Sequence, residues 1–162
     1  MPRRTFLASL SALVSPLLGG QAAEAASAAT DPTWNLSDAE WKQRLSPAAY
    51  QVLRKEGTER PFSSPLNAEK RAGMFHCAGC DLPLFSSKAK YDSGTGWPSF
   101  WQALPKAIGT KIDFKLIVPR TEYHCSRCGG HQGHVFGDGP QPTGKRYCNN
   151  GVALSFKPAA KG

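Results

Sequence analysis

The sequence predicts a small, mainly β domain with short helices at its N-terminal edge. Its length of 162 residues suits one domain, and 40% hydrophobic residues are enough for a globular core. Thirteen prolines and sixteen glycines favour short strands and turns over long helices. In two segments, 108–118 and 152–156, apolar and polar residues alternate with the period of two that is typical of half-buried strands.

The first 25 residues are expected to be an export signal. Arg3 and Arg4 give a positive start, and the apolar residues 5–18 are fewer than the roughly 20 that a spanning helix needs. The Ala-Glu-Ala run at 23–25 fits a cleavage site. The arginine pair resembles a twin-arginine signal, so we expect export of the folded protein to a bacterial periplasm. An ordinary secretory signal or an organellar presequence is the alternative.

A short helix is expected at the start of the domain, which spans residues 37–162 and follows a flexible leader of small and polar residues at 26–36. Ser37 followed three residues later by Glu40 is a capping-box pattern. It predicts a helix that runs to Leu45.

A second helix is expected from Pro47 to Glu56. Ser46 fits the N-cap position, and the proline after it suits the first helical position. Gly57 is expected to end the helix. Short segments around four later residues are further strand candidates: Phe75, Phe85, Val135 and Tyr147.

The clearest strand pattern lies at residues 108–118. Large apolar residues recur there at even spacing and are expected on a buried face, with charged residues on the opposite face. The apolar set is Ile108, Ile112, Phe114, Leu116 and Val118, and the charged set is Lys111, Asp113 and Lys115. Val152, Leu154 and Phe156 repeat the pattern near the C-terminus.

Four of the five cysteines form two Cys-x-x-Cys elements, Cys77 with Cys80 and Cys125 with Cys128. Two such turns complete a tetrahedral thiolate site, so we predict one structural zinc ion with no open position for catalysis. Disulfides or redox-active pairs are the alternatives. A histidine precedes each element, which is the reverse of the order that c-type haem attachment requires.

The fifth cysteine, Cys148, is a candidate nucleophile. Arg146 precedes it by two residues, so a strand would place both side chains on one face, where a guanidinium favours the reactive thiolate. Asn149 and Asn150 are polar neighbours, and the glycine- and proline-rich residues 137–144 form a loop before it. The alternative is a small, buried, inert cysteine.

Two histidines and a tryptophan are further candidates for the site. His131 and His134 can bind a metal together with Cys148, although single histidines are often structural. Trp97 lies between glycine and proline and is expected to be displayed on a loop. The aromatic residues that follow it are expected in the core.

Taken together, these motifs resemble the B-type peptide-methionine-(R)-S-oxide reductases. The resemblance covers roughly residues 36–156 and implies a fold of two antiparallel sheets and a role in repairing proteins under oxidative stress. It rests on the two cysteine elements and on three further motifs in the same order: Gly96-Trp97-Pro98-Ser99-Phe100, His131-x-Gly133-His134-Val135-Phe136, and Arg146-Tyr147-Cys148-x-Asn150.

The resemblance also implies a reaction on methionine-R-sulfoxide in oxidised proteins. The Cys148 thiolate attacks the sulfoxide sulfur, and methionine leaves a sulfenic acid on the cysteine. The neighbours receive roles as follows: His131, His134 and Asn150 orient the oxygen or protonate it, Trp97 packs against the terminal methyl group, and Arg146 supports the thiolate.

Thr95 departs from the family pattern, because many members carry there a second cysteine that forms a disulfide with the first. With the other four cysteines committed to zinc, we expect an external thiol to restore Cys148. A thioredoxin-like protein and a small thiol are the two candidates. A zinc-site cysteine would serve only if the metal were lost.

The formal charge of +8 is spread along the chain, with no block of five basic residues. We therefore expect neither nucleic-acid binding nor stable membrane association, and we expect a monomer. The rival functions are a non-catalytic zinc-knuckle β module, which has no need of Cys148 beside Arg146, and a zinc hydrolase, which four thiolates exclude.

Overall fold

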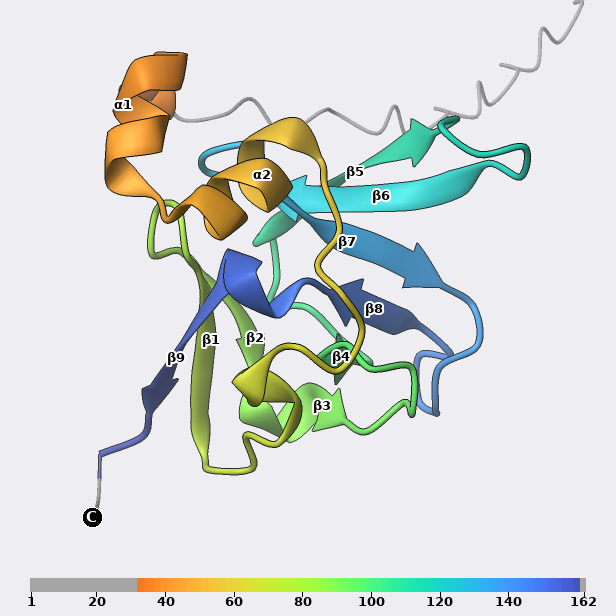
Figure 1. Ribbon diagram of the computed structural model, residues 1–162. Helices are drawn as coiled ribbons and strands as arrows, with labels where there is room; N and C mark the ends of the chain where they lie inside the picture. The colour runs from red at the N-terminus through yellow and green to blue at the C-terminus, as the bar shows by residue number, and fades with distance from the viewer. Residues whose placement is uncertain (1–31, 161–162) are drawn as a thin grey trace, which may run out of the picture.

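The computed structural model describes residues 32–160, which form two antiparallel sheets and a few short helices (Figure 1). The small sheet has the order β2-β1-β9, and the large sheet has the order β3-β4-β8-β7-β6-β5. The predicted mainly β fold is confirmed. The strands are β1 (Gly73–Cys77), β2 (Pro83–Ser86), β3 (Lys90–Tyr91), β4 (Ser99–Phe100), β5 (Ile108–Asp113), β6 (Arg120–Cys125), β7 (His131–Phe136), β8 (Arg146–Asn149) and β9 (Leu154–Pro158).

The first helix, α1 (Asp38–Arg44), begins with the predicted capping box. The Ser37 side chain accepts a hydrogen bond from the Glu40 backbone N–H, and the Glu40 carboxylate accepts one from the Ser37 backbone N–H at 2.7 Å. Each partner satisfies a backbone donor that the first turn would leave free. The helix buries Trp41 and so joins the core.

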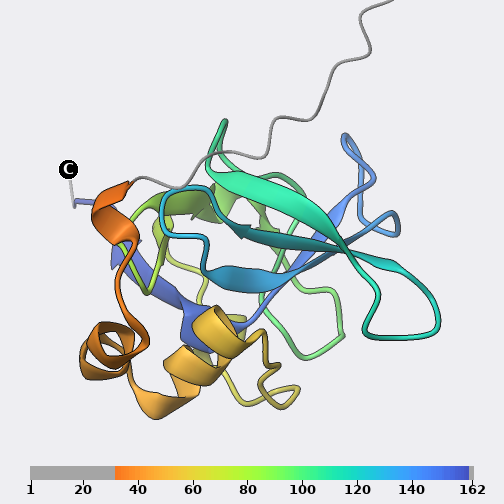
Figure 2. The same ribbon diagram turned by 90° about the horizontal axis from the view of Figure 1, so that it is seen from above.

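The second helix, α2 (Pro47–Lys55), ends one residue earlier than predicted. Glu56, not Gly57, adopts the left-handed conformation, with φ of 53°. Ion pairs from Lys111 and Lys115 of the β5 region hold the Glu56 carboxylate. Figure 2 shows both helices on the same side of the sheets. No helix within residues 32–160 is long and apolar enough to cross a membrane.

The segment 26–36, predicted to be a flexible leader, is described only from residue 32 onward. Its last part contains a 3-10 turn, η1 (Pro32–Trp34), and Trp34 stacks on Trp41 with ring centroids 6.3 Å apart. Trp34 and Leu36 therefore pack against the domain, and the other residues of 32–36 are exposed. The predicted signal at 1–25 lies outside the described residues. Three more 3-10 turns are η2 (Pro65–Asn67), η3 (Ser87–Ala89) and η4 (Gly151–Ala153).

Aromatic side chains join the two sheets. Phe75 and Phe85 of the small sheet pack against Phe100 of the large sheet, with ring centroids 4.9 and 4.2 Å apart. Tyr123 on β6 meets Phe85 edge to face at 6.1 Å. All four are fully buried. Burying rings of this size is a large apolar contribution to stability, and it fixes the large sheet on which the functional residues lie.

The structure corrects the prediction for residues 108–118. The strand β5 stops at Asp113, and residues 114–118 form the turn to β6. Asp113 is buried, whereas four of the five apolar residues that were expected on a buried face are 55–74% exposed: Ile112, Phe114, Leu116 and Val118. The fifth, Ile108, is half-buried and packs against the core. The reason for residues 114–118 is that the chain leaves the sheet after Asp113 and turns toward β6 at the outer edge of the large sheet.

Candidate functional site

The strand β8 brings Cys148 to the middle of the large sheet, between β4 and β7. Cys148 lies in register with Ser99 on one side and with His134 on the other. The strands approach so closely here that a Cβ atom on Gly133 would overlap the carbonyl oxygen of Cys148. A glycine is therefore required beside the candidate nucleophile.

A cavity of about 280 Å³ opens onto the half-buried Cys148 side chain. It is mainly apolar, with a few polar groups, as small-molecule sites usually are. Four of the predicted residues, Trp97, His134, Arg146 and Asn150, line it with Cys148; His131 does not. The other lining residues are Thr58, Thr95, Arg120, Gly133, Phe136 and Asn149.

Burial raises the pKa of the Cys148 thiol, while the charge of Arg146 and a hydrogen bond from Thr95 act in the opposite direction. Arg146 is held in place by two hydrogen bonds of 2.9 Å to the Asp138 carboxylate. Its guanidinium also lies 4.4 Å from the centroid of the Phe136 ring. The sequence-based prediction that Arg146 and Cys148 share a face is confirmed.

Replacing the charge of Arg146 should make Cys148 less reactive. Arg146→Met removes the positive charge that lowers the pKa of the Cys148 thiol. The thiol pKa therefore rises further, and the fraction of thiolate at pH 8 falls. We expect alkylation of Cys148 by iodoacetamide, followed by peptide mass spectrometry, to slow several-fold at pH 8 and to converge with wild type at high pH. The exposed neighbour provides the matched control, Lys145→Met. Equal rates for both variants would show that Arg146 does not act on the thiol.

His134 is oriented by Asp113 from across β6. Its Nε2 lies 2.7 Å from Asp113 Oδ2, which also accepts a 2.7 Å hydrogen bond from Arg120. Burial lowers the pKa of His134, and Asp113 opposes this. A neutral ring that donates from Nε2 leaves Nδ1 as an acceptor, and Nδ1 has no hydrogen-bond partner within residues 32–160. His134 can therefore accept a proton in the cavity.

His131 lies behind His134. The two rings are 5.5 Å apart at their centroids, and His131 Nδ1 lies 2.7 Å from Glu122 Oε1. The His131 ring is buried, and its Nε2 has no partner among the described residues. His131 thus packs against His134 without lining the cavity.

Trp97 is presented on the loop before β4, as predicted, and its ring lines the cavity. Its Nε1 donates a 3.1 Å hydrogen bond to the carbonyl of Glu59. Asn150 holds the same segment, because its Oδ1 accepts a 2.9 Å bond from the Glu59 backbone N–H. Its Nδ2 donates to the Gln132 carbonyl at 3.0 Å. Both ends of the Asn150 amide are therefore used to fix the backbone.

Several residues that shape the site were not identified from the sequence. Asp113 was assigned only to a solvent face, and Glu122, Asp138 and Glu59 were not considered. The carboxylates of Asp113, Glu122 and Asp138 each hold a candidate residue. The Glu59 carboxylate accepts a hydrogen bond from the backbone N–H of Val152, two residues after Asn150. The sequence holds one indication of these contacts. Arg120 and Glu122 are two residues apart on a strand, so their side chains are expected on the same face, but the residues that they contact cannot be predicted.

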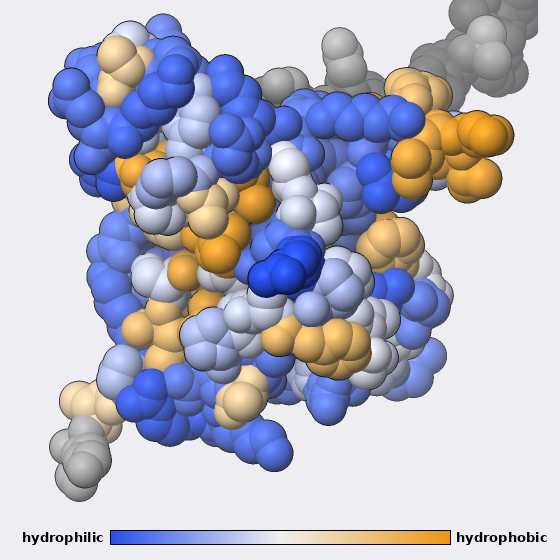
Figure 3. All heavy atoms as spheres, viewed as in Figure 1, coloured by the Kyte–Doolittle hydropathy of each residue, from blue (hydrophilic) through white to orange (hydrophobic). Residues whose placement is uncertain are grey.

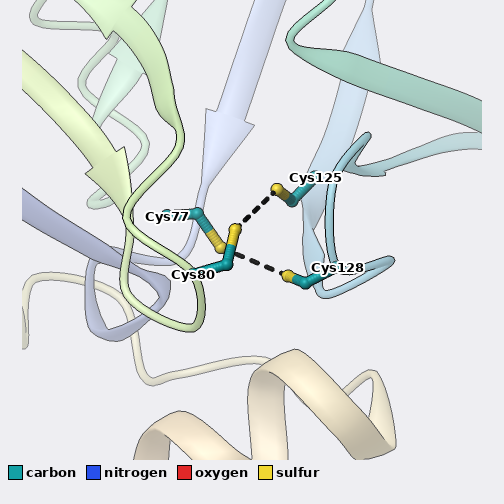
Figure 4. Close-up of side chains that lie close together, drawn as sticks. All are labelled: Cys77, Cys80, Cys125 and Cys128. Atoms are coloured by element: carbon teal, nitrogen blue, oxygen red, sulfur yellow. Dashed lines mark hydrogen bonds between the residues drawn. The ribbon is translucent and has the colours of Figure 1, made fainter. Parts of the chain in front are cut away.

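A second cluster lies at the other end of β6. The Sγ atoms of Cys77, Cys80, Cys125 and Cys128 are all within 4.8 Å of one another and all four residues are buried. Figure 4 shows the four side chains converging from two separate turns. The shortest marked separations are 3.4 Å for Cys80 with Cys125 and 3.7 Å for Cys77 with Cys128. This arrangement can hold a metal ion.

The cluster fits tetrahedral zinc. Zinc–sulfur bonds of about 2.3 Å imply tetrahedral sulfur–sulfur separations of roughly 3.8 Å, close to those observed. Three arginines bind carbonyl groups of the two turns, at 2.8 Å for Arg44, 3.0 Å for Arg54 and 3.1 Å for Arg127. Their positive charge complements the excess negative charge that four thiolates would carry on one divalent ion.

Comparison with known proteins gives a consistent family assignment. The SelR domain family matches residues 45–158. The chain is 56% identical over 120 residues to the peptide methionine sulfoxide reductase MsrB of Pseudomonas entomophila, covering 74% of this chain and 92% of that protein. It is 48% identical to the MsrB of Agrobacterium fabrum, over 80% of this chain and 96% of that protein. It is 52% identical to the MsrB of Methanosarcina barkeri, over 78% of this chain and 89% of that protein.

Proposed function

The chain belongs to the methionine-R-sulfoxide reductase B family and reduces methionine-R-sulfoxide, and from this premise we propose that Cys148 is the nucleophile of the reaction. The observation that carries the proposal is that Cys148, His134 and Arg146 meet in one cavity with Trp97 on its wall. A non-catalytic zinc-knuckle module is not favoured.

The pairing of His134 with Cys148 across β7 and β8 supports a specific order of steps. His134 Nδ1 takes the proton from the Cys148 thiol, and the charge of Arg146 favours the thiolate. The thiolate attacks the sulfoxide sulfur and forms a bond between the two sulfurs. The imidazolium, stabilised by the Asp113 carboxylate, returns the proton to the sulfoxide oxygen as the S–O bond breaks. The oxygen passes to the Cys148 sulfur as the bond between the two sulfurs breaks, which leaves Cys148 as a sulfenic acid and releases methionine with its sulfur reduced.

The remaining predicted residues position these groups. We propose that Trp97 packs on the terminal methyl group of the substrate and that Arg146 stabilises the thiolate. His131 supports the ring of His134 from behind. Asn150 acts through the Glu59 backbone, which also accepts the Trp97 indole N–H. His131 and Asn150 are thus positioning residues.

The metal we propose is one structural zinc ion held by Cys77, Cys80, Cys125 and Cys128. When bound, it joins the end of β1 to the end of β6 and supplies no catalytic step, because four thiolates leave no open position. Residues 1–25 are proposed to direct export through a twin-arginine route, and the mature chain is proposed to be a monomer.

Recycling is proposed to use an external thiol. Thr95 lines the same cavity as Cys148, and no other cysteine lines it among the residues described. A thioredoxin-like protein or a small thiol attacks the sulfenic acid, forming a mixed disulfide and water. A second thiol of the donor then forms a disulfide with the first and releases reduced Cys148.

Installing a cysteine at Thr95 should change the product of a single turnover. With methionine-R-sulfoxide peptide and no reductant, wild type should accumulate a sulfenic acid at Cys148, trapped with dimedone and located by mass spectrometry. Position 95 lines the same cavity as Cys148, so in Thr95→Cys we expect condensation to a disulfide and the loss of most of the dimedone adduct.

The matched control is Thr110→Cys, an exposed threonine on β5, which should keep the adduct. An oxygen or an adduct on a cysteine other than Cys148 in wild type would reject the proposed nucleophile. A persistent adduct in Thr95→Cys would reject the proposed proximity of position 95.

A further inference from the structure

An exposed apolar turn joins β5 to β6. We call residues 114–118 the apolar tip; it contains Phe114, Leu116, Ile117 and Val118, which are 74%, 57%, 102% and 72% exposed. Figure 3 shows this group as a hydrophobic projection at the outer end of β5 and β6. Five of the six large exposed apolar residues within residues 32–160 lie here or at the adjoining Ile112, so they form a patch rather than scattered singles.

The base of the apolar tip is fixed in place. The Asp113 carboxylate accepts a 2.9 Å hydrogen bond from the Lys115 backbone N–H. The Lys115 side chain pairs with Glu56 at 2.6 Å, and Lys111 pairs with the same carboxylate. The tip is therefore held out from the domain by specific contacts, although its apolar side chains gain no burial from that position.

The apolar tip is continuous with the catalytic cavity. Arg146 is in register with Phe136, and Arg120 with Asp113. The neighbouring pair Thr121 and Val135 joins β6 to β7, so one row of side chains crosses β8, β7, β6 and β5. Arg146, Phe136 and Arg120 of this row line the cavity. The fourth member, Asp113, forms a hydrogen bond with His134, which also lines it. The tip begins one residue after the row ends. A ligand that leaves the cavity along this row reaches the tip.

We propose that the apolar tip binds apolar side chains of an unfolded polypeptide whose methionine sulfoxide occupies the Cys148 cavity; this rests on the proposed function. Two to three strand spacings separate β8 from β6 and β5, which is about 10–15 Å. An extended chain covers about 3.4 Å per residue, so the contacted side chains lie roughly three to five residues from the sulfoxide.

The chemistry of the patch favours this occupant. Methionine is mostly buried among apolar residues in folded proteins, and its oxidation disrupts that packing. Oxidised methionines therefore lie in segments that carry apolar neighbours. The cations beside the tip, Lys111, Lys115 and Arg120, are all engaged in ion pairs with carboxylates. This pairing disfavours an anionic membrane surface as the ligand.

The test measures KM and kcat for three substrates, with wild type and with the double variant Leu116→Ser, Ile117→Ser as the enzymes. Two substrates are ten-residue peptides that contain one methionine-R-sulfoxide. Four residues from it, the leucine peptide carries three leucines and the serine peptide carries three serines. The third substrate is N-acetyl-methionine-R-sulfoxide. For wild type we expect KM for the leucine peptide to be lower by about fivefold or more than KM for the serine peptide. The double variant should lose this preference while its kcat and its activity on the small substrate stay unchanged.

The control variant is Thr110→Ser, which trims an exposed side chain of β5 and should keep the preference. Binding of a fluorescent leucine peptide to Cys148→Ser, with and without the tip substitutions, measures docking without turnover. Equal KM values for both peptides, or a preference that survives in the double variant, would overturn the proposal. So would tip-dependent binding to anionic vesicles, or tip-dependent self-association, without a peptide preference. Failure of the proposed function would appear instead as reduction of the small substrate that persists in Cys148→Ser.

Discussion

The substitution Cys148→Ser is expected to abolish reduction of methionine-R-sulfoxide, lowering kcat/KM by at least about 10⁴-fold, the scale at which removal of a nucleophile acts in other enzymes. The hydroxyl of serine is much less acidic than a thiol, so His134 would form far less of the anion, and an oxygen atom cannot accept the sulfoxide oxygen to form a stable product. The measurement is steady-state release of methionine from a blocked R-sulfoxide with dithiothreitol as reductant.

The same variant should keep its fold and metal. Cys148 is half-buried and serine is nearly the same size, so its melting temperature should stay close to that of wild type. Its metal content should equal that of wild type, because Cys148 is not one of the four clustered cysteines. Activity that persists in a folded, metal-loaded Cys148→Ser protein would remove the basis for the reaction order proposed above.

The local features of the fold followed from the sequence because their causes are local. Ser37 and Glu40 lie three residues apart, so their capping box is readable without a partner. The Cys-x-x-Cys spacing likewise predicts that two sulfurs turn together. The prediction that the two cysteine pairs meet needed a stronger assumption, namely that these four thiolates share one metal ion. The structure confirms that the four sulfurs converge.

The features that were missed depend on long-range pairing. The alternation over 108–118 is real, yet it does not show where the strand ends, and the chain leaves the sheet after Asp113 at the outer edge of the large sheet. The buried position of β5 is Asp113 because His134 and Arg120 satisfy that carboxylate from neighbouring strands. Only the register of β5, β6 and β7 brings these residues together, and a single sequence does not specify that register.

Removal of the metal is expected to unfold the domain rather than merely to inactivate it. The four-cysteine cluster joins the end of β1 to the end of β6, and the cysteine turns hold α1 and α2 through Arg44 and Arg54. Structural zinc sites contribute on the order of 10 kcal/mol in small domains, so we expect Cys77→Ser to lower the free energy of unfolding by at least about 5 kcal/mol. That corresponds to a fall in melting temperature of roughly 15 °C or more.

The measurement is thermal unfolding followed by circular dichroism, before and after chelation, with metal content determined on the same samples. Cys148→Ser is the matched control, since it also removes one thiol but should respond to the chelator as wild type does. Activity should fall together with structure, because β6 carries Cys125 at one end and, at the other, the Arg120 that binds Asp113 behind His134. If the chelated protein kept its melting temperature, or if Cys77 were joined to Cys128 by a disulfide in metal-free native protein, the cysteine cluster would be a redox centre or a passive part of the core instead of a structural metal site.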